Sequence, residues 1–347
     1  MSTRRLTADD FPVPADVRAE ILADLTKAID LDFQRSPSPQ LVFVTGQPAA
    51  GKSRTVDRLS AQLDTPAVVL DSDVLRLNHP SMPLIMDTDP QRMDVLSNGP
   101  VGEWMRGLIR HSADHGYNTI IENTLTNPDQ VAKTAGAFRE AGFEVSVAAL
   151  AVDQSISRLG IVSRYLAGID HDDFPRWTTE SSHTGAYTGM LAGLAAVDGM
   201  VDTIDVFDRS GQRLYHGDDG VAAAEFVIAG REASLDPAAI AIWAADYAEA
   251  VPRLLDPDMI TDQTRTVLTG LTADAQRLLS PADLPEHHDL LRAVLSGEEE
   301  LPAALAPSPQ QALELFDSVD LSSPGRPEPS DWTAPGRDQS PDHRPEL

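Results

Sequence analysis

The sequence predicts an α/β protein in which a doubly wound, mostly parallel sheet is flanked by helices. From residue 41 to about residue 216, short apolar runs rich in β-branched residues alternate with longer helical stretches, which is typical of parallel strands joined by crossover helices. A glycine-rich loop directly follows the first of these runs. Residues 220–317 are rich in Ala and Leu and show no strand signal, so a helical C-terminal extension is expected after the sheet.

The expected elements follow one another in a regular order. Strands are predicted at 41–45, 67–70, 119–122, 144–151 and 203–207, with a closing hairpin at 208–215. Helices are predicted at 53–59 and at about 102–115, 128–141 and 153–166. The carboxyl ends of parallel strands meet at one edge of such a sheet, and phosphate chemistry is expected there.

The glycine-rich loop is a complete P-loop motif, and it reads Gly46-Gln47-Pro48-Ala49-Ala50-Gly51-Lys52-Ser53. A predicted strand precedes it and a predicted helix follows it, which is the context that the motif requires. Backbone N–H groups of such a loop surround a phosphate at the helix N-terminus. Lys52 is expected to reach the β- and γ-phosphates, and the Ser53 hydroxyl is expected to hold Mg²⁺. The sequence therefore predicts nucleoside triphosphate binding rather than an ordinary glycine-rich turn.

The composition of the whole chain argues against several other classes of protein. The formal net charge of −27 argues against a nucleic-acid partner, because such binding needs a basic surface. The chain contains no Cys, which excludes disulfides and thiolate metal sites. No apolar run is long enough for a membrane span and the first residues do not resemble a signal peptide, so a soluble cytoplasmic protein is expected. The nine His are interpreted as lacking metal-ligand spacing, which leaves ATP and Mg²⁺ as the expected cofactors.

Acidic residues follow two of the predicted strands. Asp73 is the candidate general base for an attacking hydroxyl, because phosphoryl transfer needs a group that accepts that proton. Asp71 either orients Mg²⁺ or caps the next turn. Glu122 is a candidate Mg²⁺ ligand acting through water, and Thr124 is a candidate substrate ligand. Helix capping is the structural alternative for each of these segments.

Three arginines are conspicuous in a chain that has 27 Lys and Arg against 54 Asp and Glu. Arg158, Arg164 and Arg176 lie within 20 residues of one another. Arginines carried by a lid helix and loop stabilise the charge of a transferring phosphoryl group. Arg158 is the one that a solvated helix face explains most readily.

Together these segments resemble the zeta toxin family, the kinases of bacterial toxin–antitoxin systems, over roughly residues 40–216. An Asp-x-x-Arg-x-x-His-Pro segment of the family is matched by Asp73, Arg76, His79 and Pro80. The family's Gly-Tyr-Asn occurs at 116–118 and its Glu-Gly-Thr-Leu is replaced by Glu-Asn-Thr-Leu at 122–125. Arg164-Tyr165, Arg176 and the hairpin at 208–215 complete the resemblance.

The resemblance implies a P-loop kinase fold and an ATP- and Mg²⁺-dependent kinase. The implied acceptor is the sugar 3′-hydroxyl of UDP-N-acetylglucosamine, a nucleotide sugar, and the implied partner is an antitoxin protein. By this resemblance, Asp73 of this chain would be the base, Lys52 and Ser53 would hold triphosphate and metal, and Thr124 would touch the acceptor. Arg164 and Arg176 would clamp the transferring phosphate. Arg76 joins the substrate-binding set, and His79 is either a substrate ligand or a turn residue.

The sequence departs from the family at positions that concern the acceptor. A substrate-binding Glu expected before Gly-Tyr-Asn is Arg106, and Glu103, one turn earlier on the same helix face, is the candidate replacement. Asn123 and Thr126 replace an expected Gly and Arg. A kinase of another small molecule (an antibiotic, a nucleoside or another metabolite) is therefore an alternative. A regulatory nucleotide-binding module is an alternative from a different class.

Four parts are expected along the chain. Residues 1–38 form a helical lead-in, and residues 39–217 form the P-loop kinase domain. Residues 218–317 are expected to form several short helices interrupted by prolines, which either complete the fold or pack over the cleft and restrain the enzyme. Residues 318–347 are expected to be a disordered, Pro-rich tail.

Overall fold

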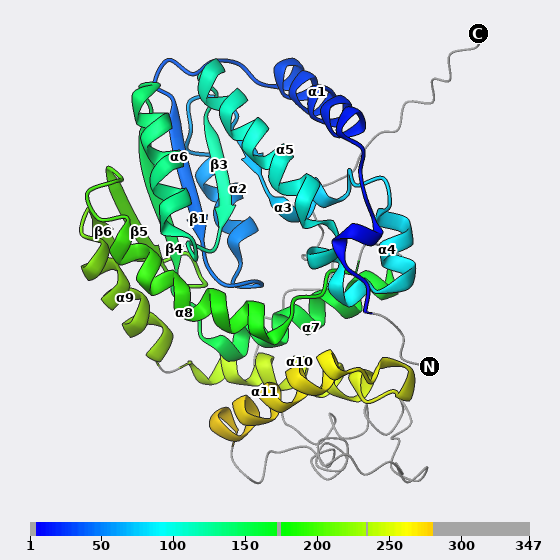
Figure 1. Ribbon diagram of the computed structural model, residues 1–347. Coiled ribbons are helices and arrows are strands. Elements are labelled where there is room, and N and C mark those ends of the chain that lie inside the picture. Colours follow the sequence, from blue (N-terminus) through cyan, green and yellow to red (C-terminus); the bar gives the residue numbers. More distant parts are fainter. Residues whose placement is uncertain (1–4, 172–174, 234, 280–347) are drawn as a thin grey trace, which may run out of the picture. The chain divides into compact units, whose positions relative to one another are not determined.

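A single mixed sheet organises the part of the chain that the computed structural model describes, which is residues 5–171, 175–233 and 235–279 (Figure 1). Its strands are β1 (Gln40–Thr45), β2 (Val68–Leu70), β3 (Thr119–Asn123), β4 (Glu144–Leu150), β5 (Thr203–Phe207) and β6 (Arg213–Gly217). The strand order is β2-β3-β1-β4-β5-β6. β1 to β5 are parallel, whereas β6 pairs antiparallel with β5. The predicted fold class is confirmed.

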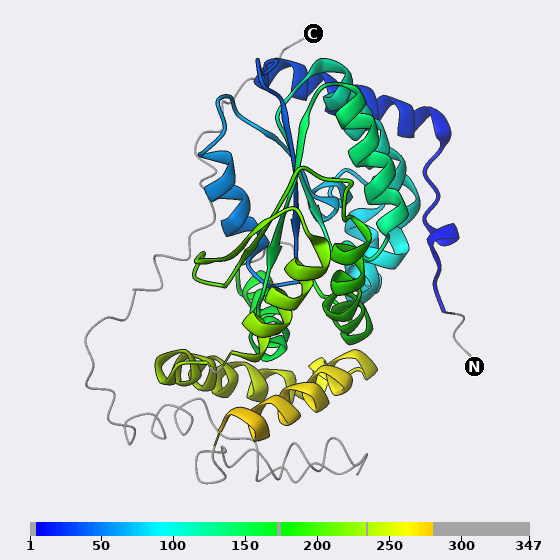
Figure 2. The same cartoon turned by 90° about the vertical axis from the view of Figure 1, so that its left-hand side faces the viewer.

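The central strand β1 is apolar on both faces because helices cover both sides of the sheet. Leu41 and Phe43 pack with Trp104 of α5 (Met93–His115) and Phe138 of α6 (Pro128–Glu140). Val42 and Val44 point the opposite way, toward α2 (Lys52–Ser60), as the two-residue period of a strand requires. Figure 2 shows the two layers, with α2 on one side of the sheet and α5 and α6 on the other.

The remaining helices complete the two layers and extend beyond them. These are η1 (Ala8–Asp10), α1 (Ala15–Asp32), α3 (Ser72–Arg76), α4 (Met82–Thr88), η2 (Pro90–Arg92), α7 (Gln154–Asp170), α8 (Glu180–Ala196), α9 (Gly220–Glu232), α10 (Pro237–Leu254), η3 (Pro257–Met259) and α11 (Asp262–Leu278). Side-chain caps fix several helix starts, as where Asn127 accepts from Gln130 N at 3.1 Å and Pro128 occupies the first turn. Among the described residues, no helix is both long and apolar enough to cross a membrane.

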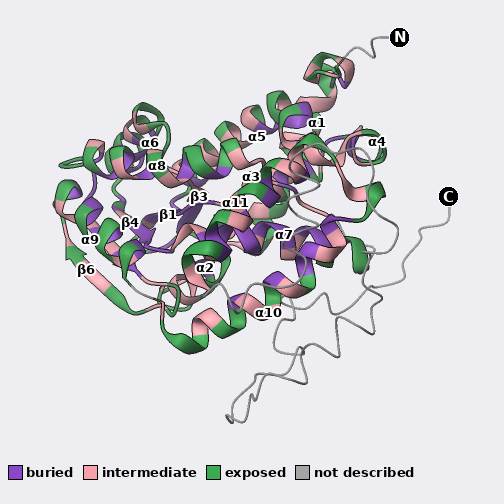
Figure 3. Cartoon of the chain, turned by 90° about the horizontal axis from the view of Figure 1, so that it is seen from below, coloured by how far each residue is buried: buried purple, intermediate pink, exposed green. Residues whose placement is uncertain are grey.

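The helices after the sheet pack on the body of the protein. α9 shares a core with the sheet through Ala223 and Val227. α10 and α11 pack under α7, where Trp243 and Leu268 join a second core with Val162. Figure 3 shows α7 and α11 side by side, with buried residues where they meet. These helices are longer than expected, and Pro252 lies inside α10 without ending it.

Two helices differ from the sequence-based expectation in a way that matters for the site. α5 begins at Met93 rather than near residue 102, because Pro100 and its neighbouring glycines are tolerated inside the helix. α8 was not predicted at all, because its many small residues give it little amphipathic pattern. The expected tail at 318–347, and the part of the helical extension after residue 279, lie outside the described residues.

Candidate active site

The P-loop joins β1 to α2 and is fixed from behind by one of its own side chains. Gly51 has a φ of 95°, in the left-handed region that glycine adopts at low cost, and it caps α2. Ala49 has a φ of 61°, also left-handed. The buried Gln47 donates through Nε2 to Val152 O at 2.8 Å and to Ser157 Oγ at 3.1 Å. The loop backbone is therefore held against α7 independently of any ligand.

Lys52 points into the loop rather than to solvent. Its ammonium donates to Gly46 O at 3.2 Å and Gln47 O at 3.4 Å. Burial lowers the pKa of Lys52, while the negative charges of Glu122 and Asp73 act against that change. A cation held in this place suits a site for phosphate oxygens.

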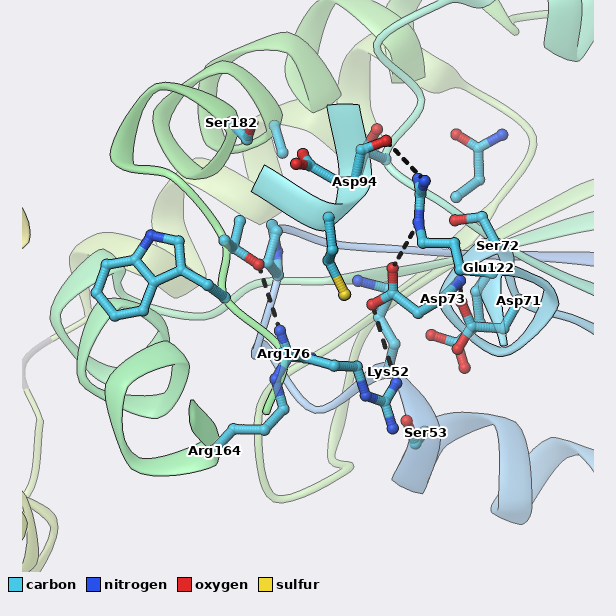
Figure 4. Close-up of a pocket in the computed structure, with 18 of the residues that line it drawn as sticks. Lys52, Ser53, Asp71, Ser72, Asp73, Asp94, Glu122, Arg164, Arg176 and Ser182 are labelled. Carbon is cyan, nitrogen blue, oxygen red and sulfur yellow. Dashed lines mark hydrogen bonds and ion pairs between the residues drawn. The ribbon is translucent and has the colours of Figure 1, made fainter. Parts of the chain in front are cut away.

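Asp71 and Asp73 lie at the start of α3, directly after β2. Asp71 caps the helix by accepting from Asp73 N at 2.8 Å, and burial and the charge of Asp73 raise the pKa of Asp71. The carboxylate of Asp73 lies 3.6 Å from Arg76 Nε and 3.9 Å from Arg176 Nη1. Asp73 is therefore oriented by two guanidinium groups, and Figure 4 shows it close to Lys52, Glu122 and Arg176.

Glu122 lies at the end of β3, at the same edge of the sheet. Burial, and then the charge of Asp71, raise the pKa of Glu122 to about 7. Three carboxyl groups gathered next to the P-loop hydroxyl of Ser53 are the oxygen ligands that Mg²⁺ prefers, directly or through water. The donor set thus fits the expected metal, whose charge would favour the ionised form of Glu122.

Two of the three conspicuous arginines reach this place, and the third does not. Arg164 of α7 donates to Thr178 Oγ1 at 3.3 Å, and among the described residues its buried Nε has no hydrogen-bond partner. Burial lowers the pKa of Arg164. Arg176 comes from the segment before α8. Arg158 is buried in ion pairs with Glu180 and Asp274, so the solvated helix face expected for it is wrong.

A cavity of about 680 Å³ brings most of the predicted site residues together. Those that line it are Pro48, Lys52, Ser53, Asp73, Arg76, Glu122, Thr124, Arg164 and Arg176. The other P-loop residues, Gly46, Gln47, Ala49, Ala50 and Gly51, shape the loop without lining the cavity. Residues from α2, α3, α5, β3, α7 and the start of α8 contribute to its walls. Within the part of the chain that the structure describes, no lining residue lies beyond residue 186.

Two predicted substrate ligands lie elsewhere. Glu103 faces α1, where it pairs with Arg18 Nε at 2.7 Å, and Arg106 is exposed on α5. His79 is buried and accepts at Nδ1 from Ser81 N at 3.2 Å, as a turn residue does. The structure therefore does not bring Glu103 or His79 to the cavity.

Arg76 lines the cavity and also joins two helices through hydrogen bonds. Its guanidinium donates to Asp94 O and Ser97 Oγ at 2.8 and 2.9 Å, and to Asn98 Oδ1 at 2.8 Å. These bonds hold α3 against the first turns of α5. Through them Arg76 positions Asp73.

Sequence reasoning missed several residues that line the cavity. Asp94 is in the first turn of α5, and Thr178 and Ser182 lie just before and within α8. Both helix starts were missed, so the polar residues there attracted no attention. The one available signal was the Thr179 N-cap, whose hydroxyl accepts from Ser182 N at 3.1 Å.

Asn123, at a position where the family has Gly, shapes the loop that carries Thr124. Its Oδ1 accepts from Leu125 N at 2.6 Å. Leu125 has a φ of 53°, a conformation that few non-glycine residues adopt. The Asn side chain therefore stabilises a turn that brings Thr124 into the cavity wall.

Comparisons with known proteins agree with the geometry. The family model for zeta toxin matches residues 24–219. Toxin zeta of Enterococcus hirae and that of Streptococcus pyogenes are each 26% identical over 183 residues, which are 51% of this chain and 63% of theirs. Toxin PezT of Streptococcus pneumoniae serotype 4 is 28% identical over 145 residues, which are 42% of this chain and 57% of PezT. The match thus spans less than two thirds of the length of these relatives.

A solved structure shows that the fold is shared. It comes from the PezAT chromosomal toxin–antitoxin system of Streptococcus pneumoniae, and it aligns with a TM-score of 0.61 and 18% sequence identity. The alignment covers 71% of this chain and 99% of that chain. Because the family model also matches more than half of the 347 residues, the chain belongs to the zeta toxin family.

Proposed function

We propose that this protein is an ATP- and Mg²⁺-dependent kinase that phosphorylates a hydroxyl of a nucleotide sugar, UDP-N-acetylglucosamine or a related compound. The observation that carries the proposal is the gathering of a P-loop lysine, a carboxylate and two arginines around one cavity. Lys52, Asp73, Arg164 and Arg176 all line it. These are the kinds of groups that phosphoryl transfer needs, namely electrostatic stabilisation and a proton acceptor.

The proposed role of each residue follows from its position around the cavity. Asp73, oriented by Arg76 and Arg176, accepts the proton of the attacking hydroxyl. Arg164 and Arg176 stabilise the negative charge that develops on the transferring group. Backbone N–H groups of residues 46–53, except Pro48, which has none, would hold the phosphates together with Lys52, while Ser53 and Glu122 would hold Mg²⁺. When bound, ATP with Mg²⁺ supplies the phosphoryl group.

The nature of the acceptor rests on the family more than on the cavity. Thr124, Thr126, Ser182 and Asp94 offer hydrogen bonds to a hydroxylated substrate. However, neither Glu103 nor Arg106 reaches the cavity, so the family's acidic contact to the acceptor is not matched. A kinase of another hydroxylated metabolite is the second candidate, and this mismatch favours it.

An antitoxin protein is the proposed partner, and the cytoplasm is the proposed location. A related structure comes from a toxin–antitoxin system, and the family model for zeta toxin matches residues 24–219 of this chain. A regulatory module without catalysis is less well supported, since a switch does not need a base such as Asp73 held between two arginines.

The test is ATP consumption by the purified protein with UDP-N-acetylglucosamine and with a panel of other nucleotide sugars. An Asp73→Asn variant should lose turnover while retaining ATP binding. An Asp87→Asn variant, altered at an exposed position of α4, should match the parent protein. Turnover on another acceptor alone would replace the substrate and keep the mechanism. ATP binding without turnover on any acceptor would instead support the regulatory module.

A further inference from the structure

A cluster of two histidines and an aspartate lies outside the active site, where α1 packs on α5. One side-chain ligand atom from each of Asp30, His111 and His115 lies within 4.8 Å of the other two. The expectation that the histidines lack metal-ligand spacing is wrong here, because His111 and His115 are four residues apart on α5. Residues at that spacing share one helix face, and α1 brings the carboxylate to it.

The three side chains are already oriented toward one another. His111 Nε2 lies 2.6 Å from Asp30 Oδ1, and the two imidazole ring centroids are 4.0 Å apart. Ligand atoms that bind a tetrahedral zinc ion at about 2.0–2.2 Å lie roughly 3.3–3.6 Å from one another. Small rotations of side chains would therefore suffice to place all three ligand atoms around one ion.

Neighbouring groups provide the support that metal ligands usually have. Tyr117 donates its hydroxyl to Asp30 Oδ1 at 2.9 Å. His115 Nδ1 lies 2.8 Å from the His111 carbonyl oxygen, and a bond donated there leaves Nε2 of His115 as its free ligand atom. Second hydrogen bonds of this kind fix the orientation and tautomer of ligands in metal sites.

We propose that Asp30, His111 and His115 form a binding site for a divalent transition metal ion of the zinc type. Two imidazoles and one carboxylate favour Zn²⁺, Ni²⁺ or Cu²⁺ over Mg²⁺ and Ca²⁺, which prefer oxygen ligands. Three protein ligands leave a fourth position for water, as the exposure of Asp30 and His115 allows.

The site has a structural consequence rather than a catalytic one. None of its three ligands lines the active-site cavity. Farther along the same helix pair, Arg18 pairs with Glu103, and Trp104 Nε1 donates to Arg18 O at 3.0 Å. A metal ion at the other end would fix the last turns of α1 to α5, so its binding should stabilise the folded protein.

The test is a titration of the full-length protein with ZnCl₂ by isothermal calorimetry, in buffer containing millimolar MgCl₂. Magnesium is included because a chain of net charge −27 attracts cations without specificity. We expect one saturable zinc site, release of protons on binding because the ligand nitrogens must be deprotonated, and a higher thermal midpoint with zinc.

His115→Gln is the variant of choice, because His115 is exposed and the hydrogen bond between His111 and Asp30 remains intact. Its zinc affinity should fall at least about tenfold, as losses of metal-site groups do, while its thermal midpoint without zinc stays that of the parent. His216→Gln is the matched control, since His216 also pairs with an aspartate, Asp205, at 2.9 Å but belongs to no group of three metal-ligating side chains among the described residues. The absence of a saturable site in the parent protein would overturn the proposal. Equal affinity of the parent and His115→Gln proteins, or an equal loss in His216→Gln, would also overturn it.

Discussion

Arg158 of α7 donates to the carboxylate of Glu180 through two nitrogens, with Nε–Oε2 at 3.0 Å and Nη2–Oε1 at 2.9 Å. Its third nitrogen, Nη1, donates to Asp274 of α11. Both the arginine and Asp274 are almost fully buried. One guanidinium group therefore joins α7, which carries Arg164, to α8 and to the helices that follow the sheet.

Replacing Asp274 should destabilise the protein strongly, because it leaves part of a buried guanidinium without its partner. We expect Asp274→Asn to lower the free energy of unfolding by about 3 kcal/mol, measured by urea denaturation. Asp170→Asn is the control, since Asp170 also joins α7 to the extension, through Arg253 at 2.6 Å, but in an exposed pair. That change should cost about 1 kcal/mol or less. Equal losses in the two variants would contradict the importance of burial.

Acid should destabilise the protein through His183, which is buried behind the P-loop. Burial lowers the pKa of His183 to about 4, as do the charges of Arg158 and Arg231, while Glu180 opposes them. His183 thus binds a proton near pH 6.5 in the unfolded chain but only near pH 4 in the folded protein. The free energy of unfolding therefore falls as the pH falls through this window. Between pH 7 and pH 5 the loss should be about 2 kcal/mol.

The measurement is urea denaturation at the two pH values in parent, His183→Asn and His216→Asn proteins. The buried change should remove this part of the pH dependence, whereas the exposed one should leave it. His183 Nε2 lies 2.8 Å from Ser157 Oγ, which also bonds Gln47. Because the folded protein keeps His183 neutral down to about pH 4, ATP affinity of the parent protein should not change through His183 between pH 7 and pH 5, and should weaken only as the pH approaches 4.

The sequence was sufficient to predict the sheet and the residues at strand ends, since both depend on local patterns. The P-loop and Asp73 each follow a short apolar strand, Glu122 lies at the end of another, and these strands proved parallel. Glu103 and His79 were proposed from the resemblance to the family and from their spacing along the chain. Spacing does not reveal which face of α5 looks toward α1, or that His79 completes a turn.

Long-range pairs were beyond the reach of sequence patterns. Arg158 and Asp274 are 116 residues apart, and Gln47 and Arg231 are 184 residues apart. Neither contact has a local signature, because each depends on how α9 and α11 pack on the sheet and on α7. For the same reason, the sequence did not reveal that Asp30 lies beside the histidines of α5, although the four-residue spacing of those histidines was visible.

The close approach of the P-loop to α7 should make Gly160 sensitive to substitution. A Cβ at this position would lie 3.1 Å from Ala49 Cβ, in the left-handed part of the loop. Crowding of this kind costs about 1–3 kcal/mol, so we expect Gly160→Ala to weaken ATP binding by about tenfold or more. The measurement is calorimetric titration with ATP and Mg²⁺.

Gly136→Ala is the matched helix control for this prediction. A Cβ there would meet none of the described residues within 4 Å, and Gly136 is exposed on α6. Because alanine is the better helix former, this change should stabilise the protein by up to about 1 kcal/mol and leave ATP affinity unchanged. If the two variants bound ATP equally well, the contact between Gly160 and Ala49 would have no part in shaping the loop.

Removing the helices after the sheet should unfold the protein rather than activate it. We propose that these helices complete the kinase domain, because Val227 packs in the core of the sheet and Leu268 packs against α7. Truncation after Gly217 should therefore give an insoluble protein, or one whose thermal midpoint is far below that of the parent. Truncation after Asp317, which removes only the tail expected to be disordered, should leave the midpoint and the turnover unchanged. A soluble Gly217 truncation with faster turnover would instead show that the extension restrains the enzyme. A soluble Gly217 truncation with the turnover and the thermal midpoint of the parent would show that the extension neither restrains the enzyme nor completes the domain.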